Sequence, residues 1–171
     1  MVGRQGRGTP NASQVHPEMN LTLGCGHRIK GAGWLNHDLT RRTGVQLAFD
    51  LAEFPWPVAN LRGKIAHILA EDVLEHIPAH LTLKAMDECW ELLVPTGTIE
   101  IQVPIFGGRN HLADLTHCRG FSLESFDILD PATTTGNKNP WYTTRRWKIL
   151  ERRQDVPGHG FNLHFSLRKR P

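Results

Sequence analysis

Two short stretches near the start of the chain decide its fold: Leu21-Thr-Leu-Gly-Cys-Gly26 and Gly33-Trp-Leu-Asn-His-Asp38. Each is predicted to be a β-strand, the first running into a glycine turn and the second ending on a carboxylate. Val45–Phe49 alternates as a third strand before Asp50-Leu51, and the apolar run Ile65–Leu69 is typical of a parallel strand buried on both faces. Parallel strands need crossover connections, so this order of elements predicts an α/β sheet.

The rest of the chain supplies one clear crossover helix and a terminal hairpin. Apolar residues at helical spacing predict an amphipathic helix over Leu81–Leu93, which Pro95 and Gly97 end. Further expected elements are a strand at Thr98–Val103, a helix within Ser122–Leu129 with Ser122 as its N-cap, a polar loop over 132–140, and strands over 147–156 and 161–167. The sequence therefore predicts a doubly wound, mostly parallel sheet that carries a C-terminal antiparallel β-hairpin.

Length and composition indicate one globular domain. The 171 residues, 39% hydrophobic and 22% charged, exclude the fibrous and disordered classes. Residues 1–19 lack periodicity and are expected to be a flexible tail, whereas 20–171 form a single domain. No apolar run approaches the ~20 residues of a membrane span, and no apolar segment follows the N-terminal charges as in a secretory signal. Three widely spaced cysteines argue against a disulfide framework, so we expect a cytoplasmic protein.

The C-terminal part of the chain is basic. Residues 140–171 hold eight basic and two acidic side chains, which favours a solvated basic face over a specific anionic partner. Asn139-Pro-Trp-Tyr142 resembles the (D/N)PPY motif of amino-methylating enzymes, but it does not follow the fourth strand as that motif does. We interpret it as a turn into the terminal strand. Aromatic and basic residues alternate over 141–147, which leaves a nucleic-acid acceptor open without favouring it.

Polar groups follow four predicted strands. Gly24 and Gly26 end the first, Asp38 the second, Asp50 the third and Ala70-Glu71 the fourth. Ligands of open α/β sheets bind at the carboxyl ends of the strands, where a glycine turn and two carboxylates suit an adenosine. A dinucleotide site is disfavoured, because the turn lacks the third glycine of GxGxxG and too few residues precede Asp38 for a full helix.

The order of these motifs resembles that of class I S-adenosylmethionine-dependent methyltransferases, specifically their small type 11 group. The resemblance rests on the stretches already quoted together with Asp72-Val-Leu-Glu-His-Ile-Pro78, Glu91-Leu-Leu-Val-Pro-Thr-Gly97, Asn110-His-Leu-Ala-Asp-Leu-Thr-His117 and Phe121-Ser-Leu-Glu-Ser-Phe126. It implies a Rossmann-like sheet, S-adenosylmethionine as cofactor and methyl transfer to oxygen, nitrogen or carbon. Compared with the family, the N-terminal cap is reduced, the first crossover is truncated, and Pro95-Thr-Gly97 replaces the usual Pro-Gly-Gly turn.

The resemblance also implies roles for individual residues. Gly24, Cys25 and Gly26 would line the methionine portion of the cofactor, and Asp38 would hold the ribose diol. Asp50 and Leu51 would flank the adenine. Ala70 and Glu71 would lie under the sulfonium. Glu75 and His76 are as consistent with holding the strand-to-helix corner together as with touching a ligand.

The acceptor side is less determined. Methyl transfer is an in-line displacement that depends on alignment, and it needs a base only when the acceptor carries a proton. The candidates for that base are His111, Asp114 and His117, because the family's loop after the fifth strand lies across the methyl group. We expect no metal on the His-x-x-Asp-x-x-His spacing, whose histidines do not share a helix face. The sequence favours a methyltransferase acting on a small molecule or a glycan; the alternative is a degenerate module of the same fold that binds cofactor or a partner.

Overall fold

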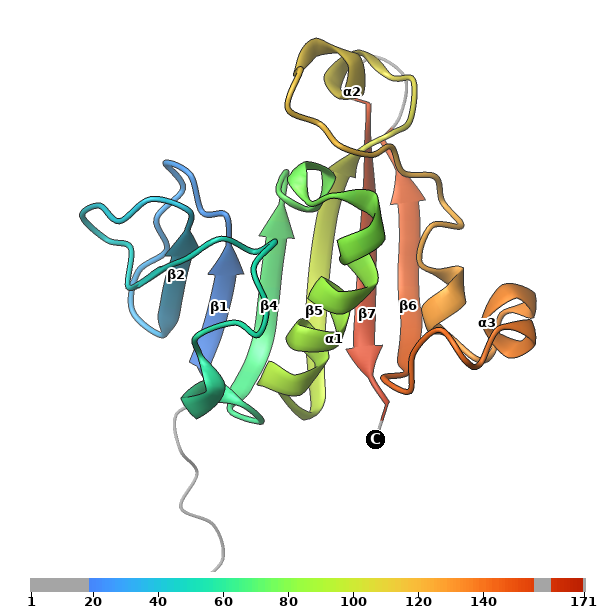
Figure 1. The fold of residues 1–171 in the computed structure, drawn as a ribbon, viewed down its shortest axis with the longest axis horizontal. Coiled ribbons are helices and arrows are strands. Elements are labelled where there is room, and N and C mark those ends of the chain that lie inside the picture. The colour runs from blue at the N-terminus through green and yellow to red at the C-terminus, as the bar shows by residue number, and fades with distance from the viewer. Residues whose placement is uncertain (1–18, 156–160, 171) are drawn as a thin grey trace, which may run out of the picture.

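The structure is a computed structural model that describes residues 19–155 and 161–170. Its centre is a seven-stranded sheet (Figure 1). The strands are β1 (Met19–Leu23), β2 (Trp34–Asp38), β3 (Leu47–Ala48), β4 (Ile65–Glu71), β5 (Leu93–Pro104), β6 (Trp147–Gln154) and β7 (Asn162–Lys169). The predicted tail lies outside the described residues apart from Met19, which begins β1, and so does the end of the predicted strand at Val156.

The sheet order confirms the predicted fold class. The strands run β3-β2-β1-β4-β5-β7-β6, with β1 to β5 parallel and β7 antiparallel to both neighbours. The chain crosses from β3 past β2 and β1 to β4, so β1 and β4 are the neighbours at which the order reverses. Such a topological switch point is where open α/β sheets bind ligands.

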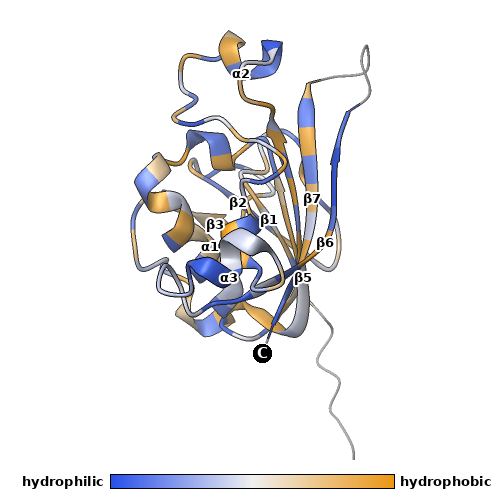
Figure 2. Cartoon of the chain, turned by 90° about the vertical axis from the view of Figure 1, so that its right-hand side faces the viewer, coloured by the Kyte–Doolittle hydropathy of each residue, from blue (hydrophilic) through white to orange (hydrophobic). Residues whose placement is uncertain are grey.

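The helices are few and short. They are α1 (Thr82–Leu92), α2 (Arg109–Ala113), α3 (Thr134–Lys138) and the 3-10 turns η1 (Ala59–Leu61), η2 (Leu74–His76), η3 (Ala79–Leu81) and η4 (Asp127–Leu129). Figure 2 shows the sheet nearly edge-on, with α1 and α3 on one side. Among the described residues no helix covers the other face, because the connections from β1 to β2 and from β2 to β3 form turns.

The strands show which face is covered. Toward α1 they present buried apolar side chains such as Ile68, Ile99 and Leu167. The residues between them, including His67 and Glu100, lie on the uncovered face and are half-buried or exposed. The prediction that Ile65–Leu69 is buried on both faces is therefore wrong. Parallel strands usually read as continuous apolar runs because helices cover both faces, and here the described residues place helices on one face only.

Two segments after β5 differ from their predicted structure. Ser122–Leu129 is not a helix beyond η4, because Ser125 Oγ accepts from Ser122 N at 2.8 Å and Ser122 Oγ from Glu124 N at 3.3 Å. Such local side-chain bonds stabilise turns in competition with a helix. The predicted polar loop over 132–140 contains α3, whose N-cap Thr133 accepts a hydrogen bond from Gly136 N at 3.0 Å.

The other expected elements are close to those observed. The predicted helix Leu81–Leu93 is α1 to within a residue at each end, and Thr82, Ala85, Met86, Cys89 and Leu92 form its buried stripe. The predicted third strand is shorter than expected and covers only Leu47–Ala48. Strand β5 begins directly at Leu93, with an irregularity in its pairing with β4.

No helix among the described residues has the length and apolar character to span a membrane.

Truncating a side chain to alanine should affect the free energy of unfolding differently on the two faces of the sheet. Ile99 is 0% exposed on the helix-covered face, whereas its neighbour Glu100 is exposed on the other. We expect Ile99→Ala to lower the free energy of unfolding by about 2–5 kcal/mol, and Glu100→Ala to change it by less than about 0.5 kcal/mol. Urea denaturation followed by circular dichroism measures both. Equal losses would mean that the uncovered face is packed against something.

Candidate functional site

A cleft opens at the carboxyl ends of β1 to β4. Its volume is about 600 Å³, within the usual range for ligand pockets. Four of the eight predicted cofactor-binding residues line it, namely Gly24, Asp38, Asp50 and Leu51. The end of β1, the end of β2 and the segment after β3 therefore come together at one cleft, whereas Cys25, Gly26, Ala70 and Glu71 are not among its lining residues.

The glycine turn after β1 is held by residues of β2. Gly24 N donates to His37 Nδ1 at 3.2 Å, Cys25 N to His37 O at 2.8 Å, and Gly26 N to Asp38 Oδ2 at 2.8 Å. Gly24 and Gly26 have positive φ values of 58° and 52°. At Gly24 a Cβ would come within 2.5 Å of Val73 Cγ2, so only glycine allows this approach of β1 to the segment after β4. Cys25 is 2% exposed beneath the turn.

Asp38 both holds the glycine turn and lines the cleft. Besides Gly26 N, its Oδ2 accepts from Arg42 Nη2 at 3.0 Å, and Oδ1 accepts from Thr40 N at 3.3 Å. Burial opposes ionisation of this carboxyl, but the backbone donors and the Arg42 guanidinium together hold its pKa below its usual range. Asp38 is thus an ionised acceptor at the cleft. Arg42, which also donates to Gly26 O, was not singled out by the sequence analysis.

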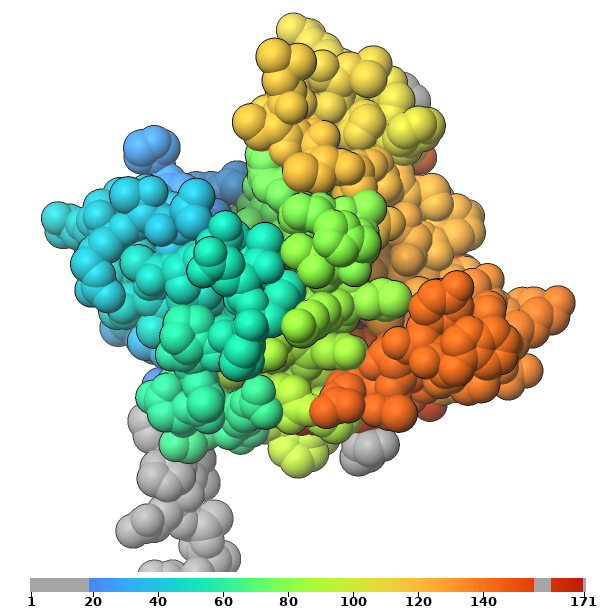
Figure 3. All heavy atoms as spheres, viewed as in Figure 1, coloured from blue at the N-terminus to red at the C-terminus, as the bar shows by residue number. Residues whose placement is uncertain are grey.

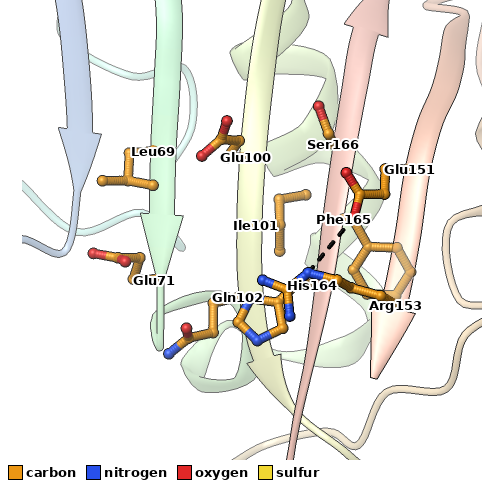
Figure 4. A pocket seen from close by; sticks show the side chains of 10 residues that line it. All are labelled: Leu69, Glu71, Glu100, Ile101, Gln102, Glu151, Arg153, His164, Phe165 and Ser166. Atoms are coloured by element: carbon orange, nitrogen blue, oxygen red, sulfur yellow. Dashed lines mark ion pairs between the residues drawn. The ribbon is translucent and has the colours of Figure 1, made fainter. Parts of the chain in front are cut away.

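The two residues predicted to lie under a sulfonium are placed differently. Ala70 is 0% exposed, and Glu71 lines a groove of about 200 Å³ on the uncovered face of the sheet, with Gln102 and His164 (Figure 4). The side chain of Glu71 therefore points away from the cleft. The neighbour Asp72, with φ of 53°, does line the cleft and is held by Arg28 Nη2 at 3.2 Å and Gln102 Nε2 at 3.0 Å.

A second cavity of about 320 Å³ adjoins the cleft, and Asp72 and His76 line both. Two of the three predicted catalytic residues, Asp114 and His117, line this second cavity together with Glu75. They belong to the segment between β5 and η4, which lies beyond the end of β5 in Figure 1 and forms the uppermost part of the surface in Figure 3. The third, His111, is not among the lining residues, and its Nδ1 accepts from Gly107 N at 3.4 Å.

The groups around this second cavity are connected. Thr116 Oγ1 donates to Asp114 Oδ1 at 2.6 Å and lies 3.0 Å from His76 Nδ1. His117 Nδ1 lies 3.0 Å from His111 O, and its Nε2 is 3.9 Å from both Glu75 Oε1 and Asp114 Oδ2. Hydrogen bonds from Thr116 hold the pKa of Asp114 below its usual range, whereas burial raises the pKa of Glu75 to about 7. The cavity therefore joins an ionised carboxylate, a buried carboxyl and two imidazoles.

The sequence patterns identified the aspartates at the strand ends more readily than the histidines beside them. The Leu-Glu-His triplet containing Glu75 and His76 was a visible signal with two open interpretations, and the structure places both residues at the second cavity. His37 gave no signal, because a histidine within a strand is indistinguishable from an ordinary core residue. The segment 139–142 lies at the end of the sheet opposite the cleft (Figure 1). Shortly after this segment, Arg145 Nη2 donates to Glu91 Oε1, in the C-terminal half of α1, at 2.7 Å.

Comparison with solved structures places the fold. A Haloferax volcanii protein described as a methyltransferase in complex with the activator Trm112 has a TM-score of 0.59 and 12% identity, covering 91% of this chain and 83% of its own. The Burkholderia thailandensis 1,6-didemethyltoxoflavin-N1-methyltransferase with bound S-adenosylhomocysteine has a TM-score of 0.55 and 15% identity, covering 91% and 72%. A Rhodobacter sphaeroides protein described as a zinc-dependent alcohol dehydrogenase has a TM-score of 0.57 and 11% identity, covering 92% and 87%.

These similarities show a shared fold. Three further matching structures are described as S-adenosylmethionine-dependent methyltransferases. The seven-stranded order with its terminal antiparallel pair is the fold that the sequence resemblance implied. No protein-family model matches the chain, and no curated protein sequence matches it. Function must therefore be argued from the site.

The His37 contacts predict an acid-sensitive fold. Since Nδ1 accepts from Gly24 N, the ring proton is on Nε2, which donates to Phe49 O at 2.9 Å. Burial lowers the pKa of His37, so below about pH 6.5 the unfolded chain binds more protons than the folded chain. The free energy of unfolding therefore decreases as the pH falls through this range. We expect the free energy of unfolding to be lower at about pH 5 than at about pH 7.5, and His37→Gln to reduce this difference.

Guanidinium denaturation at the two pH values measures the effect. Because other groups also titrate, the decisive quantity is the change in the wild-type difference caused by His37→Gln. An unchanged difference would mean that His37 carries its proton in the folded state as readily as in the unfolded state.

Proposed function

We propose that this chain is an S-adenosylmethionine-dependent methyltransferase that acts on a small-molecule or glycan acceptor. The observation that carries the proposal is the convergence of a glycine turn, Asp38, and Asp50-Leu51 on one cleft at the topological switch point. The shared fold with S-adenosylmethionine-dependent methyltransferases supports it. The second cavity supplies a separate space for the acceptor.

The residues present fit the cofactor. The backbone at Gly24 and Gly26 leaves the turn free of side chains, and at Gly26 an added Cβ would meet nothing within 4 Å. The ionised Asp38 is suited to accept hydrogen bonds from both ribose hydroxyls. In doing so it would give up its hydrogen bond from Arg42. Leu51, Phe49 and Ile77 give the cleft an apolar part for the adenine ring, with Asp50 as an acceptor for its amino group.

S-adenosylmethionine, when bound, supplies an electrophilic methyl group on a sulfonium. The chain's own contribution is alignment: the cleft holds the nucleoside, and His76 and Asp72 lie between the cleft and the second cavity. Cys25 and Ala70 are buried, and we assign them to the floor of the site rather than to direct contact. We assign Glu71 a contribution through its backbone only, since its side chain lines the uncovered face.

Nucleic acid is not favoured as the acceptor. Of the aromatic residues interleaved with basic ones, Trp141 and Tyr142 are 73% and 54% exposed, but neither lines the cleft or the second cavity. The competing proposal is a degenerate module that binds the cofactor or a partner without transferring a methyl group. The described structure has no helix over one face of the sheet, which favours a need for a partner.

Calorimetric titration of the purified chain with S-adenosylmethionine, S-adenosylhomocysteine and NAD tests the cofactor. We expect dissociation constants in the micromolar range for the first two and no binding of NAD. Release of S-adenosylhomocysteine with an added acceptor then separates an enzyme from a binding module. Absence of binding by all three ligands would refute the cofactor assignment.

Asp38→Asn tests the ribose contact. The asparagine oxygen can still accept from Gly26 N, so the turn is preserved, but the charge is lost. We expect the affinity for S-adenosylmethionine to fall by about 1.5–3 kcal/mol, roughly 10- to 100-fold. Glu53→Gln, which removes an exposed carboxylate after β3 outside the cleft lining, is the matched control and should bind as wild type. Asp38→Ala is less suitable, because it also leaves Gly26 N without its acceptor. Equal affinities of wild type and Asp38→Asn would contradict the assignment.

A further inference from the structure

Three side chains from distant parts of the sequence bring metal-binding atoms to one place. One ligand atom each of Glu75, His76 and His117 lies within 4.8 Å of the others. Glu75 and His76 come from η2, directly after β4, and His117 comes from the segment after α2. Their meeting point is the second cavity, outside the residues assigned to the cofactor.

Hydrogen bonds fix the tautomer of both histidines. His117 Nδ1 contacts the carbonyl of His111, which can only accept, so the proton is on Nδ1 and the lone pair on Nε2. Thr116 Oγ1 gives its own proton to the carboxylate of Asp114, so it accepts from His76 Nδ1, and the lone pair of His76 is also on Nε2. A histidine that ligates a metal characteristically donates its other ring N–H to a carbonyl or a carboxylate-linked oxygen in this way.

The Glu75 carboxyl of the cluster is buried, and one of its two oxygens has no partner in the described part of the chain. Glu75 is 1% exposed, and among the described residues its Oε2 has no hydrogen-bond partner. Its Oε1 is 3.9 Å from His117 Nε2, which is too long for a hydrogen bond, and that nitrogen carries a lone pair in the neutral ring. A buried carboxyl oxygen without a donor is costly, and the ring nitrogen of His117 that lies 3.9 Å from the same carboxyl offers a lone pair rather than a proton. A cation among the three side chains would satisfy both groups.

We propose that Glu75, His76 and His117 bind a divalent transition-metal ion. Two imidazoles and one carboxylate form a ligand set suited to zinc or its first-row neighbours, with further coordination positions left open. The carbonyl of His111 and the Thr116–Asp114 pair are then the groups that orient the histidines. His111 and Asp114, predicted from the sequence as catalytic residues, are positioning residues in this assignment, and His117 is a ligand.

The location gives the ion a role at the acceptor. His76 lines both the cleft and the second cavity, so an ion on its ring lies between the two spaces. Resting on the proposed function, we infer that an open coordination position takes an oxygen of the acceptor, which favours a hydroxyl-bearing acceptor. A metal would lower the pKa of a coordinated hydroxyl and orient it, so that the hydroxyl proton passes to water without a separate strong base. The resulting oxygen anion would form its bond to the methyl carbon as the carbon–sulfur bond of the cofactor breaks, which leaves S-adenosylhomocysteine. Metal binding itself does not depend on the methyltransferase assignment.

The test uses the full chain without an affinity tag, treated with chelator and then dialysed. Co²⁺ is added while visible absorption is recorded, and Zn²⁺ binding is measured by calorimetry, both without S-adenosylmethionine. We expect one ion per chain and a Co²⁺ spectrum that Zn²⁺ abolishes. His76→Ala and His117→Ala should each weaken binding at least about tenfold. His80→Ala, which removes an exposed histidine four residues from His76, is the matched control and should bind as wild type.

A thermal measurement keeps the test independent of the spectrum. Zn²⁺ should raise the Tm of the wild type and of His80→Ala, and not that of His117→Ala or of a folded Glu75→Gln. Failure of the wild type to bind either ion, or equal binding by all the variants, would overturn the proposal. Because no cofactor is present, a negative result here leaves the cofactor titration intact, and a failed cofactor titration leaves the metal result intact.

Discussion

The hydrogen bonds that β2 provides to the glycine turn after β1 are the contacts on which the rest of the site depends. With no helix described between these strands, the N–H groups of Gly24, Cys25 and Gly26 have no helical turn beside them to orient the chain. Instead, all three N–H groups donate hydrogen bonds to β2. The acceptors are a ring nitrogen and the carbonyl oxygen of His37 and a carboxylate oxygen of Asp38. The strand therefore replaces the helix as the support of the ligand cleft, and the carboxylate proposed to hold the ribose also holds the turn.

The one-sided helical cover of the described sheet also explains the composition of its strands. A strand covered on one side needs apolar residues only at alternate positions, and β5 and β7 alternate in this way, with Glu100, Gln102, His164 and Ser166 on the uncovered face. Of these, Gln102 Nε2 donates to Asp72 Oδ1 at 3.0 Å and His164 Nε2 lies 2.8 Å from Asp155 Oδ1. The core of the described domain lies on the other face, between the sheet and α1 with its neighbouring loops (Figure 2). The fold keeps the strand order of a doubly wound protein while its described part has one layer of helices.

Sequence patterns predicted well what depends on local chemistry. Strand ends marked by glycine or aspartate, and the helical stripe from Thr82 to Leu92, follow from alternation and spacing alone. What failed depends on tertiary contacts: the run Ile65–Leu69 gives no sign that one of its faces is uncovered, and the side chain of Glu71 leaves the cleft because strand residues alternate. The cluster of Glu75, His76 and His117 could not be predicted from spacing, since the two histidines are 41 positions apart in the sequence and only the fold brings them together.

The two cavities are built in different ways. The cleft is lined by strand ends and the segments that follow them, whereas the second cavity is lined by η2 and by the segment after β5, which carries the exposed side chains of Phe106, Leu112 and Leu115. That segment is joined to η2 by the hydrogen bond from Cys118 N to Glu75 O at 2.7 Å and by the contact of Thr116 Oγ1 with His76 Nδ1 at 3.0 Å. The proposed cation would add a further link, because His117 lies on the segment while Glu75 and His76 lie on η2, so the proposed acceptor site and its position beside the cleft would depend on the same three ligands.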